Sequence, residues 1–131
     1  MRRREVREHV FRMLFFKDFH EGSELNEQIE LYFDSFVEPI ADDSANLSER
    51  FEMVLTKLDE IDQILTDAAS GWKLNRMNKV DLTILRLAVF EMRFDEDIPV
   101  KVAINEAIEL AKIFGGEESP GFINGVLAKL A

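Results

Sequence analysis

Residues 79–94, KVDLTILRLAVFEMRF, decide the fold class of this chain. Wound as a helix, the stretch is apolar around nearly its whole circumference, which is typical of a central helix that is covered on all sides. Asn78 directly precedes the stretch and is a good N-cap, because its side-chain oxygen can accept a backbone N–H of the first turn. The sequence therefore predicts a helical core built around a buried helix over residues 79–94.

Helical patterns continue on the C-terminal side of this stretch. Pro99 leads into a helix that ends at Phe114, and the glycine pair at 115–116 is expected to terminate it. The Ser-Pro pair at 119–120 then predicts an N-cap followed by proline at the first position of a last helix. Two more helices are therefore expected to cover the central one.

Three further helices are expected on the N-terminal side. The first runs from Arg3 to Phe19, and the second has Ser23 as its N-cap and ends near Pro39. The third is expected as one long helix from about residue 44 to residue 69, because its apolar residues keep helical spacing throughout. No stretch alternates between apolar and polar residues as a strand does.

The fold class predicted from these patterns is all-α, with about six helices. We expect a single domain over residues 1–131, made of two packed three-helix subdomains over residues 1–70 and 71–131. The composition agrees, because 47% hydrophobic and 32% charged residues are normal for a globular chain. The chain has no cysteine, which excludes a disulfide framework, a thiolate zinc site and an iron–sulfur cluster.

The sequence predicts a cytoplasmic protein. No apolar run approaches the roughly 18 residues that a membrane-spanning helix needs. The N-terminus begins with charged residues and lacks the apolar core of a secretion signal. We therefore expect neither membrane insertion nor secretion.

Charge is distributed unevenly along the chain. The total is −10, with about +3 in residues 1–20, −12 in residues 21–70 and −1 in residues 71–131. The positive charge of the first region comes mainly from an N-terminal arginine cluster: Arg2, Arg3, Arg4 and Arg7. Guanidinium groups bind phosphates in bidentate geometry, so the cluster is a candidate RNA or DNA contact. The alternative is that these arginines pair with the acidic helices.

Catalysis and metal binding are poorly supported by the sequence. His9 and His20 stand eleven residues apart, roughly 16 Å on a helix that rises about 1.5 Å per residue, so they cannot share one metal ion. No phosphate-binding glycine loop and no HExxH or GxSxG motif is present. We expect no enzymatic activity, no metal and no cofactor.

Two positions interrupt otherwise apolar helices and call for an explanation. Arg86 lies within the central helix and needs a carboxylate partner if it is buried, for which Glu106 and Glu109 are the candidates. In the last helix, the Asn-Gly pair at 124–125 lowers helix propensity. This pair suggests either close helix packing at the glycine or a surface for a ligand or partner.

Several runs of sequence together resemble the NusB family of bacterial transcription antitermination proteins. The most specific are VKVAINEAIELAK at residues 100–112 and FINGVL at residues 122–127. The run ILRLA at residues 84–88 and the arginine-rich run RREVRE at residues 3–8 also fit the family pattern. The resemblance covers essentially the whole chain and is densest over residues 72–131.

The resemblance implies a non-enzymatic function. Family members bind the single-stranded boxA element of nascent RNA together with the ribosomal protein called NusE. The resulting complex helps RNA polymerase pass terminators, notably on ribosomal RNA operons. The expected partners are therefore boxA-type RNA, NusE and the RNA polymerase antitermination complex.

The resemblance also assigns roles to individual residues. The arginine-rich motif that contacts RNA in the family matches Arg3, Arg4 and Arg7, and Arg2 adjoins it. Two positions near the RNA path match Glu118 and Phe122. The NusE interface of the family matches Asp81, with Arg76 close to it in sequence.

Three alternatives stay open from the sequence. The first is a protein–protein scaffold that binds a NusE-like partner and has little RNA affinity of its own. The second is a NusB-like domain of the kind attached to RNA cytosine methyltransferases, although the sequence ends at Ala131 without a cofactor-binding region. The third concerns assembly, since some relatives form homodimers that cover the RNA-binding surface.

Overall fold

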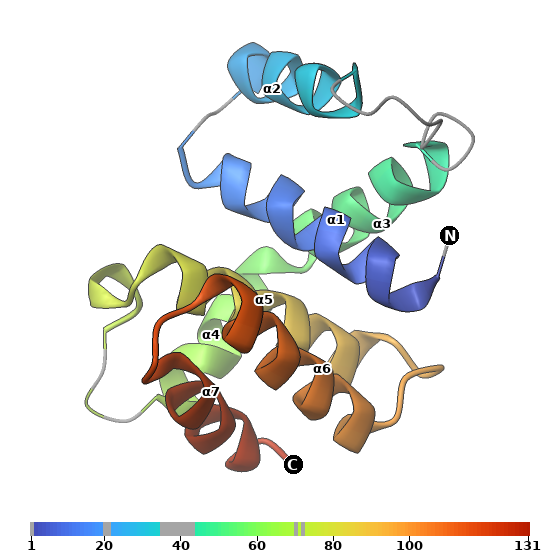
Figure 1. The fold of residues 1–131 in the computed structure, drawn as a ribbon. Coiled ribbons are helices and arrows are strands. Elements are labelled where there is room, and N and C mark those ends of the chain that lie inside the picture. Colours follow the sequence, from blue (N-terminus) through green and yellow to red (C-terminus); the bar gives the residue numbers. More distant parts are fainter. Residues whose placement is uncertain (1, 20–21, 35–43, 70, 72) are drawn as a thin grey trace. The chain divides into compact units, whose positions relative to one another are not determined.

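The computed structural model describes residues 2–19, 22–34, 44–69, 71 and 73–131, and every regular element in these ranges is a helix. The all-α prediction is confirmed (Figure 1). The chain divides into two compact units, Met1–Leu55 and Thr56–Ala131. Among the described residues, no helix has both the length and the apolar character needed to cross a bilayer. The predicted single domain, with subdomains over residues 1–70 and 71–131, stays a prediction.

Within the described residues, the first unit contains α1 (Arg3–Lys17), α2 (Gly22–Asp34) and most of α3 (Ser44–Thr56). Helix α1 ends two residues before the predicted Phe19. Helix α2 begins at Gly22, so the prediction of Ser23 as its N-cap is wrong. The backbone of Gly22 has φ 58, a left-handed conformation that glycine adopts without steric cost. The predicted helix end near Pro39 lies outside the described residues.

Helices α1 and α2 pack against each other through aromatic side chains. The ring of Tyr32 on α2 meets the rings of His9 and Phe16 on α1 edge to face, with centroid separations of 5.7 and 5.5 Å. Edge-to-face pairs of this kind are favourable beyond the area that they bury. The contact fixes α2 on one face of α1.

The second unit is built around α5 (Lys79–Phe94), which packs against α4 (Leu58–Ala68), α6 (Val100–Phe114) and α7 (Ser119–Ala128). The prediction of a central helix is confirmed, since nine consecutive or nearly consecutive residues of α5 are buried: Leu82, Thr83, Ile84, Leu85, Leu87, Ala88, Val89, Phe90 and Glu91. A short 3₁₀ helix, η2 (Leu74–Arg76), precedes α5. The alanines Ala103, Ala107 and Ala111 of α6 are also buried, which lets this helix approach closely.

The long helix expected over residues 44–69 is two helices, α3 and α4, so that prediction is wrong. The backbone leaves helical geometry at Lys57, with φ −103 and ψ 2, and α4 begins at the next residue. The Lys57 side chain lies over the Phe94 ring, 5.3 Å from its centroid, and pairs with Glu60 at 3.7 Å. A break of one residue leaves the apolar residues near helical spacing, which is why the pattern did not reveal it.

The predicted helix ends are confirmed at most positions of the second unit. The side chain of Asn78 accepts the backbone N–H of Val80 at 2.8 Å, which is the expected N-cap of α5. Helix α6 ends at Phe114 with Gly115 as its C-cap. Ser119 is the first residue of α7 rather than its N-cap, which is Glu118, so that assignment was wrong by one residue.

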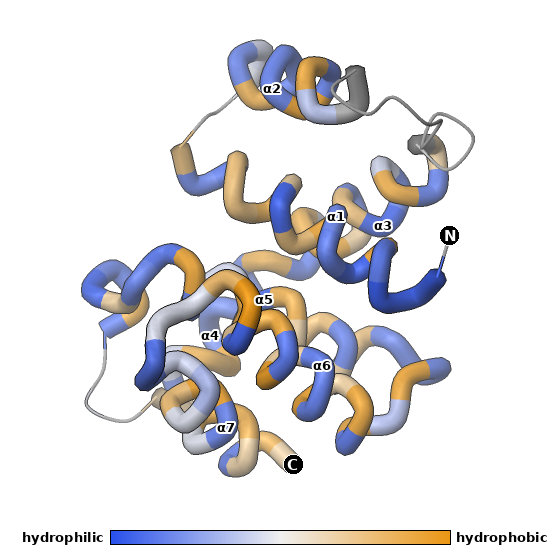
Figure 2. Tube along the Cα trace, in the orientation of Figure 1, coloured by the Kyte–Doolittle hydropathy of each residue, from blue (hydrophilic) through white to orange (hydrophobic). Residues whose placement is uncertain are grey.

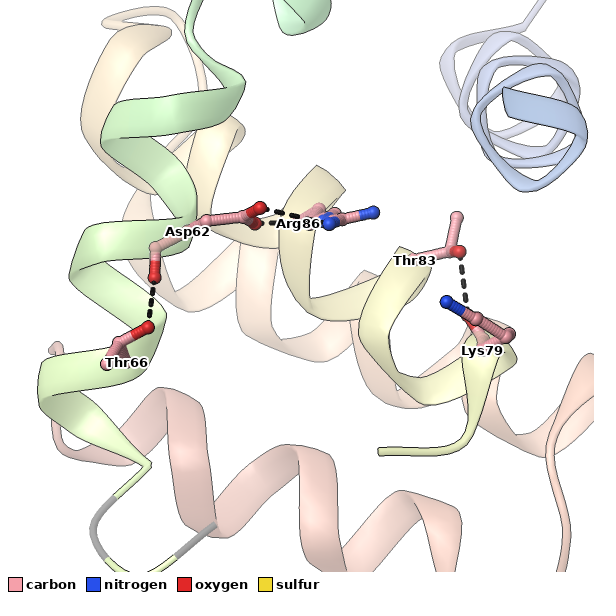
Figure 3. A network of polar contacts seen from close by, with 5 residues as sticks. All are labelled: Asp62, Thr66, Lys79, Thr83 and Arg86. Carbon is pink, nitrogen blue, oxygen red and sulfur yellow. Dashed lines mark hydrogen bonds and ion pairs between the residues drawn. The ribbon is translucent and has the colours of Figure 1, made fainter. Parts of the chain in front are cut away.

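The ion pair predicted for Arg86 exists, with a different carboxylate. Arg86 donates to Asp62 of α4 through Nε and Nη2, each at 2.9 Å, in a bidentate pair that joins α4 to α5 (Figure 3). The predicted candidates were Glu106 and Glu109. Glu109 pairs with Lys112 at 3.2 Å, and a contact of Arg86 with Glu106 stays a prediction. The sequence predicted that Arg86 needs a carboxylate partner, but it did not predict that α4 supplies one.

Candidate nucleic-acid and protein interface

The first turn of α1 presents a group of exposed arginines. Arg2 is the N-cap of α1, and its carbonyl accepts the N–H of Val6 at 3.0 Å. The side chains of Arg2, Arg3 and Arg4 are all exposed. Figure 2 shows this end of α1 as hydrophilic, with apolar residues further along the helix. Because the helix dipole is positive here, an anion at this end would be favourable for both the dipole and the guanidinium groups.

Arg7 differs from the other predicted arginines. Its residue is only 8% exposed, so it belongs to the buried part of α1. The next residues on its helix face are Val10, Phe11 and Leu14, which are also buried. This spacing of three, four and seven residues is the signal that could have placed Arg7 on the inward face.

A polar contact inside the first unit holds α1 to α2. His9 Nδ1 and the Tyr32 hydroxyl form a short hydrogen bond, and His9 is 8% exposed. Burial lowers the pKa of His9 from 6.5, and the Arg12 charge lowers that pKa further, against the opposite effect of Glu5 and Glu8. Burial also raises the pKa of Tyr32 above 10. His9 is therefore a neutral packing residue near pH 7.

The predicted RNA-facing residues Glu118 and Phe122 lie together at the start of α7. Glu118 is exposed, and its carbonyl accepts the N–H of Phe122 at 3.1 Å, so the two residues occupy successive turns. The Phe122 side chain is half-buried. A carboxylate and an aromatic ring thus share one end of α7. We call residues 117–122 the α7 tip.

The predicted partner-facing residues Arg76 and Asp81 flank the start of α5. Arg76 is exposed at the end of η2, and Asp81 lies in the first turn of α5, where a negative charge favours the helix dipole. Asp81 Oδ1 is buried and has no hydrogen-bond partner within the described part of the chain. Buried carboxylate oxygens normally accept hydrogen bonds, and the donor of a partner could reach this atom only after the side chain turns outward.

The Asn-Gly pair of α7 lies on the outer surface. Asn124 and Gly125 are both exposed, and a methyl group on Gly125 would meet no atom within 4 Å. The suggestion of close helix packing at Gly125 is therefore wrong. The alternative, a surface for a ligand or partner, stays a prediction.

A shallow groove lies at the C-terminal ends of three helices of the second unit. Its lining comes from α4, α5 and the residues after α7: Ile64, Asp67, Ala68, Arg93, Lys129 and Leu130. Arg93 donates to the Leu130 carbonyl at 3.3 Å. Since helix C-termini carry partial negative charge, the two cations have a structural explanation here. Among the described residues, no group of three His, Cys, Asp or Glu side chains could hold a metal ion.

The predicted residues fall into both units. The arginine cluster belongs to the first, whereas Arg76, Asp81, Glu118 and Phe122 belong to the second. Ser119 was predicted only as a helix cap, and its contact with Gly116 was missed: the residue is 5% exposed and its hydroxyl accepts the Gly116 N–H at 3.1 Å. The signal that could have predicted this contact is the spacing of three residues between Gly116 and Ser119.

The fold and these surfaces define a helical binding protein, with exposed arginines at one helix start, an acidic and an aromatic residue at another, and a buried carboxylate oxygen that has no hydrogen-bond partner among the described residues. The chain belongs to the NusB family, whose model matches residues 4–131. The transcription antitermination protein NusB of Lachnoclostridium phytofermentans is 61% identical over 130 residues, covering 99% of this chain and 98% of the relative. The predicted family is thereby confirmed.

Solved structures share this fold. A NusB structure from T. maritima matches with a TM-score of 0.85 and 35% identity, covering 100% of this chain and 91% of that one. A structure of antitermination factors NusB and NusE in complex with double-stranded RNA matches with a TM-score of 0.76 and 22% identity, covering 96% and 92%. The family consists of transcription antitermination factors that are not enzymes, which confirms the prediction of a non-enzymatic protein.

Proposed function

We propose that this chain is a cytoplasmic antitermination factor that binds boxA-type single-stranded RNA together with ribosomal protein NusE. In this proposal it acts within the RNA polymerase antitermination complex and supports transcription of ribosomal RNA operons. The family supports the proposal, and so does the shared fold with a NusB that was solved with NusE and RNA. The observation that carries it is the exposed arginine group at the first turn of α1.

The proposed RNA contacts are Arg2, Arg3, Arg4 and Arg7 of α1, with Glu118 and Phe122 of α7. The exposed arginines would neutralise phosphates, which gives affinity that falls as salt rises. Arg7 is buried, so its side chain must be uncovered before it can reach a phosphate. The half-buried Phe122 ring offers a surface on which an unpaired base can stack.

The test is a titration of labelled boxA-type, scrambled and double-stranded RNA with the full chain, with and without NusE. We expect selective binding of the boxA-type strand when NusE is present. Arg2→Ala/Arg3→Ala should weaken binding, while Lys101→Ala/Lys112→Ala, which removes the same charge from exposed sites on α6, should change it little. Equal affinities for all three RNAs would contradict the proposal.

A second candidate, a scaffold that binds NusE with little RNA contact of its own, is favoured by one observation. The buried Oδ1 of Asp81, which has no hydrogen-bond partner among the described residues, lies in the first turn of α5, close in sequence to the exposed Arg76. Asp81→Lys should then abolish complex formation with NusE, whereas Asp97→Lys in an exposed turn should not. Undiminished NusE binding by Asp81→Lys would exclude Asp81 from the interface.

A homodimer is the competing assembly within the proposal. A second copy that covered the arginines of α1 would exclude RNA, so RNA affinity would fall as protein concentration rises. Sedimentation of the chain alone, with RNA, and with RNA and NusE measures the assembly directly. A dimer that persists with RNA bound would show that the RNA-binding surface is not the dimer surface.

A further inference from the structure

The connection between α6 and α7 holds the α7 tip through two reciprocal hydrogen bonds. The N–H of Gly116 donates to Ser119 Oγ at 3.1 Å, and the N–H of Ser119 donates to the Gly116 carbonyl at 3.1 Å. We call this pair the tip clamp. It closes a ring around Glu117 and Glu118, the two exposed acidic residues of the connection. Ser119 itself is buried, whereas Gly116 is exposed, so the clamp joins a buried side chain to the exposed connection.

Gly115 makes room for the clamp. A Cβ atom at this position would lie 2.6 Å from both Cβ and Oγ of Ser119 and 2.8 Å from the Ala111 carbonyl oxygen. The backbone of Gly115, with φ −93 and ψ −175, is one that any residue can adopt. The need for glycine here is therefore one of space, and the buried Ser119 side chain fills that space.

The clamp sets where the tip residues sit. Glu118 is the N-cap of α7, and its carbonyl accepts the Phe122 N–H at 3.1 Å, so the position of the cap determines where the first turn places the ring. A shift of Ser119 would therefore displace both Glu118 and Phe122. Helix α6 fixes the other side, because the Gly115 N–H donates to the Ala111 carbonyl at 2.9 Å.

The chemistry of the tip is suited to bases rather than to phosphates. Two exposed carboxylates repel a phosphate backbone, but a carboxylate accepts well from the exocyclic amine of a base. The Phe122 ring adds a stacking surface that carries no charge. Recognition of an unpaired base by such a pair depends on position, since hydrogen bonds weaken steeply when donor and acceptor are misaligned.

We propose that Gly115 and Ser119 are positioning residues that hold Glu118 and Phe122 where they select among unpaired bases of the bound RNA. The inference rests on the proposed function and adds its source of sequence selectivity. Selectivity then comes from the clamped tip, whereas the salt-dependent part of the affinity comes from α1.

The experiment measures the ratio of dissociation constants for scrambled and boxA-type RNA, at several salt concentrations, with NusE present. Gly115→Ala creates the overlap with Ser119, and Ser119→Ala removes only the clamp acceptor. Gly116→Ala is the matched control, because a methyl group there meets no atom within 4 Å and the N–H is retained. We expect the ratio to fall at least fivefold in the first two variants and to stay at the wild-type value in the third, with the salt dependence unchanged in all.

Amide hydrogen exchange of the same full-length variants separates positioning from unfolding. The Gly116 and Phe122 amides should exchange faster in Ser119→Ala and Gly115→Ala than in Gly116→Ala, while amides of α5 keep their protection. If the wild type distinguishes the two RNAs and Gly115→Ala and Ser119→Ala distinguish them equally well, the positioning role of the clamp is overturned but the proposed function is not. A wild type that does not distinguish the two RNAs would overturn the proposed function.

Discussion

The start of α1 and the α7 tip begin two helices with opposite chemistry. Helix α1 opens with three exposed arginines and has no side-chain cap, whereas α7 opens with two exposed glutamates beside a buried serine clamp. The arginines can adjust to any phosphate path, because long side chains in water have many conformations. The tip has less freedom to adjust, because two hydrogen bonds hold it. The difference assigns adaptable affinity to one end and position-dependent selectivity to the other.

The largest effect on RNA affinity is expected from removing the exposed arginines of α1. Arg2→Ala/Arg3→Ala/Arg4→Ala should weaken RNA binding by about 30-fold, at roughly 0.7 kcal/mol for each of the three exposed charge pairs. The slope of log affinity against log salt should fall by about 2, at roughly 0.7 per phosphate contact of a single strand. Filter binding at four salt concentrations measures both, and an unchanged slope would contradict the role of α1.

Arg7 tests whether buried and exposed arginines of the same helix differ. Arg7→Ala should lower the free energy of unfolding by about 1–3 kcal/mol, because it opens space in the buried face and leaves polar groups without their partner. Arg3→Ala, at an exposed position, should change it by less than about 0.5 kcal/mol. Urea denaturation compares them, and equal stabilities would mean that Arg7 has no structural role.

Phe122 tests how much the α7 tip contributes to RNA binding. Phe122→Ala should weaken binding of boxA-type RNA by about tenfold, the loss of one base–aromatic stack, without altering the salt slope. Phe122→Tyr keeps the ring and serves as the control. A loss of affinity that disappears at high salt would show that the tip acts through charge.

The smallest effect is a pH dependence of the first unit. Because burial lowers the pKa of His9 in the folded state, the unfolded chain binds the proton more readily, so stability falls as pH drops below about 6.5. His9→Gln should remove this part of the pH dependence. Thermal unfolding of both proteins between pH 7.5 and 5 measures it, and parallel curves would refute the role of His9.

Local features of the fold could be predicted from the sequence. The Asn78 cap and the end of α6 at Phe114 depend on neighbouring residues, and both agree with the structure. The sequence did not reveal the break between α3 and α4 at Lys57, because one non-helical residue barely disturbs the apolar spacing around it. The partner of Arg86 did not show either, because Asp62 comes from a helix that is adjacent only in three dimensions.

The candidate site was predictable in composition but not in geometry. An arginine-rich start was evident, yet the burial of Arg7 follows from the apolar face formed by Val10, Phe11 and Leu14, which charge counting ignores. Similarly, the sequence predicted Ser119 as the N-cap of α7. Its hydroxyl instead accepts the N–H of Gly116, three residues earlier in the chain. Both errors arose where a polar side chain has an inward structural task.

The most direct test of the account compares boxA-type and scrambled RNA on the wild-type chain with NusE, across a series of salt concentrations. If α1 supplies charge-dependent affinity and the α7 tip supplies charge-independent selectivity, log affinity against log salt should give two parallel lines separated by a constant factor. Lines that converge at high salt, so that selectivity disappears with the electrostatic attraction, would contradict the account.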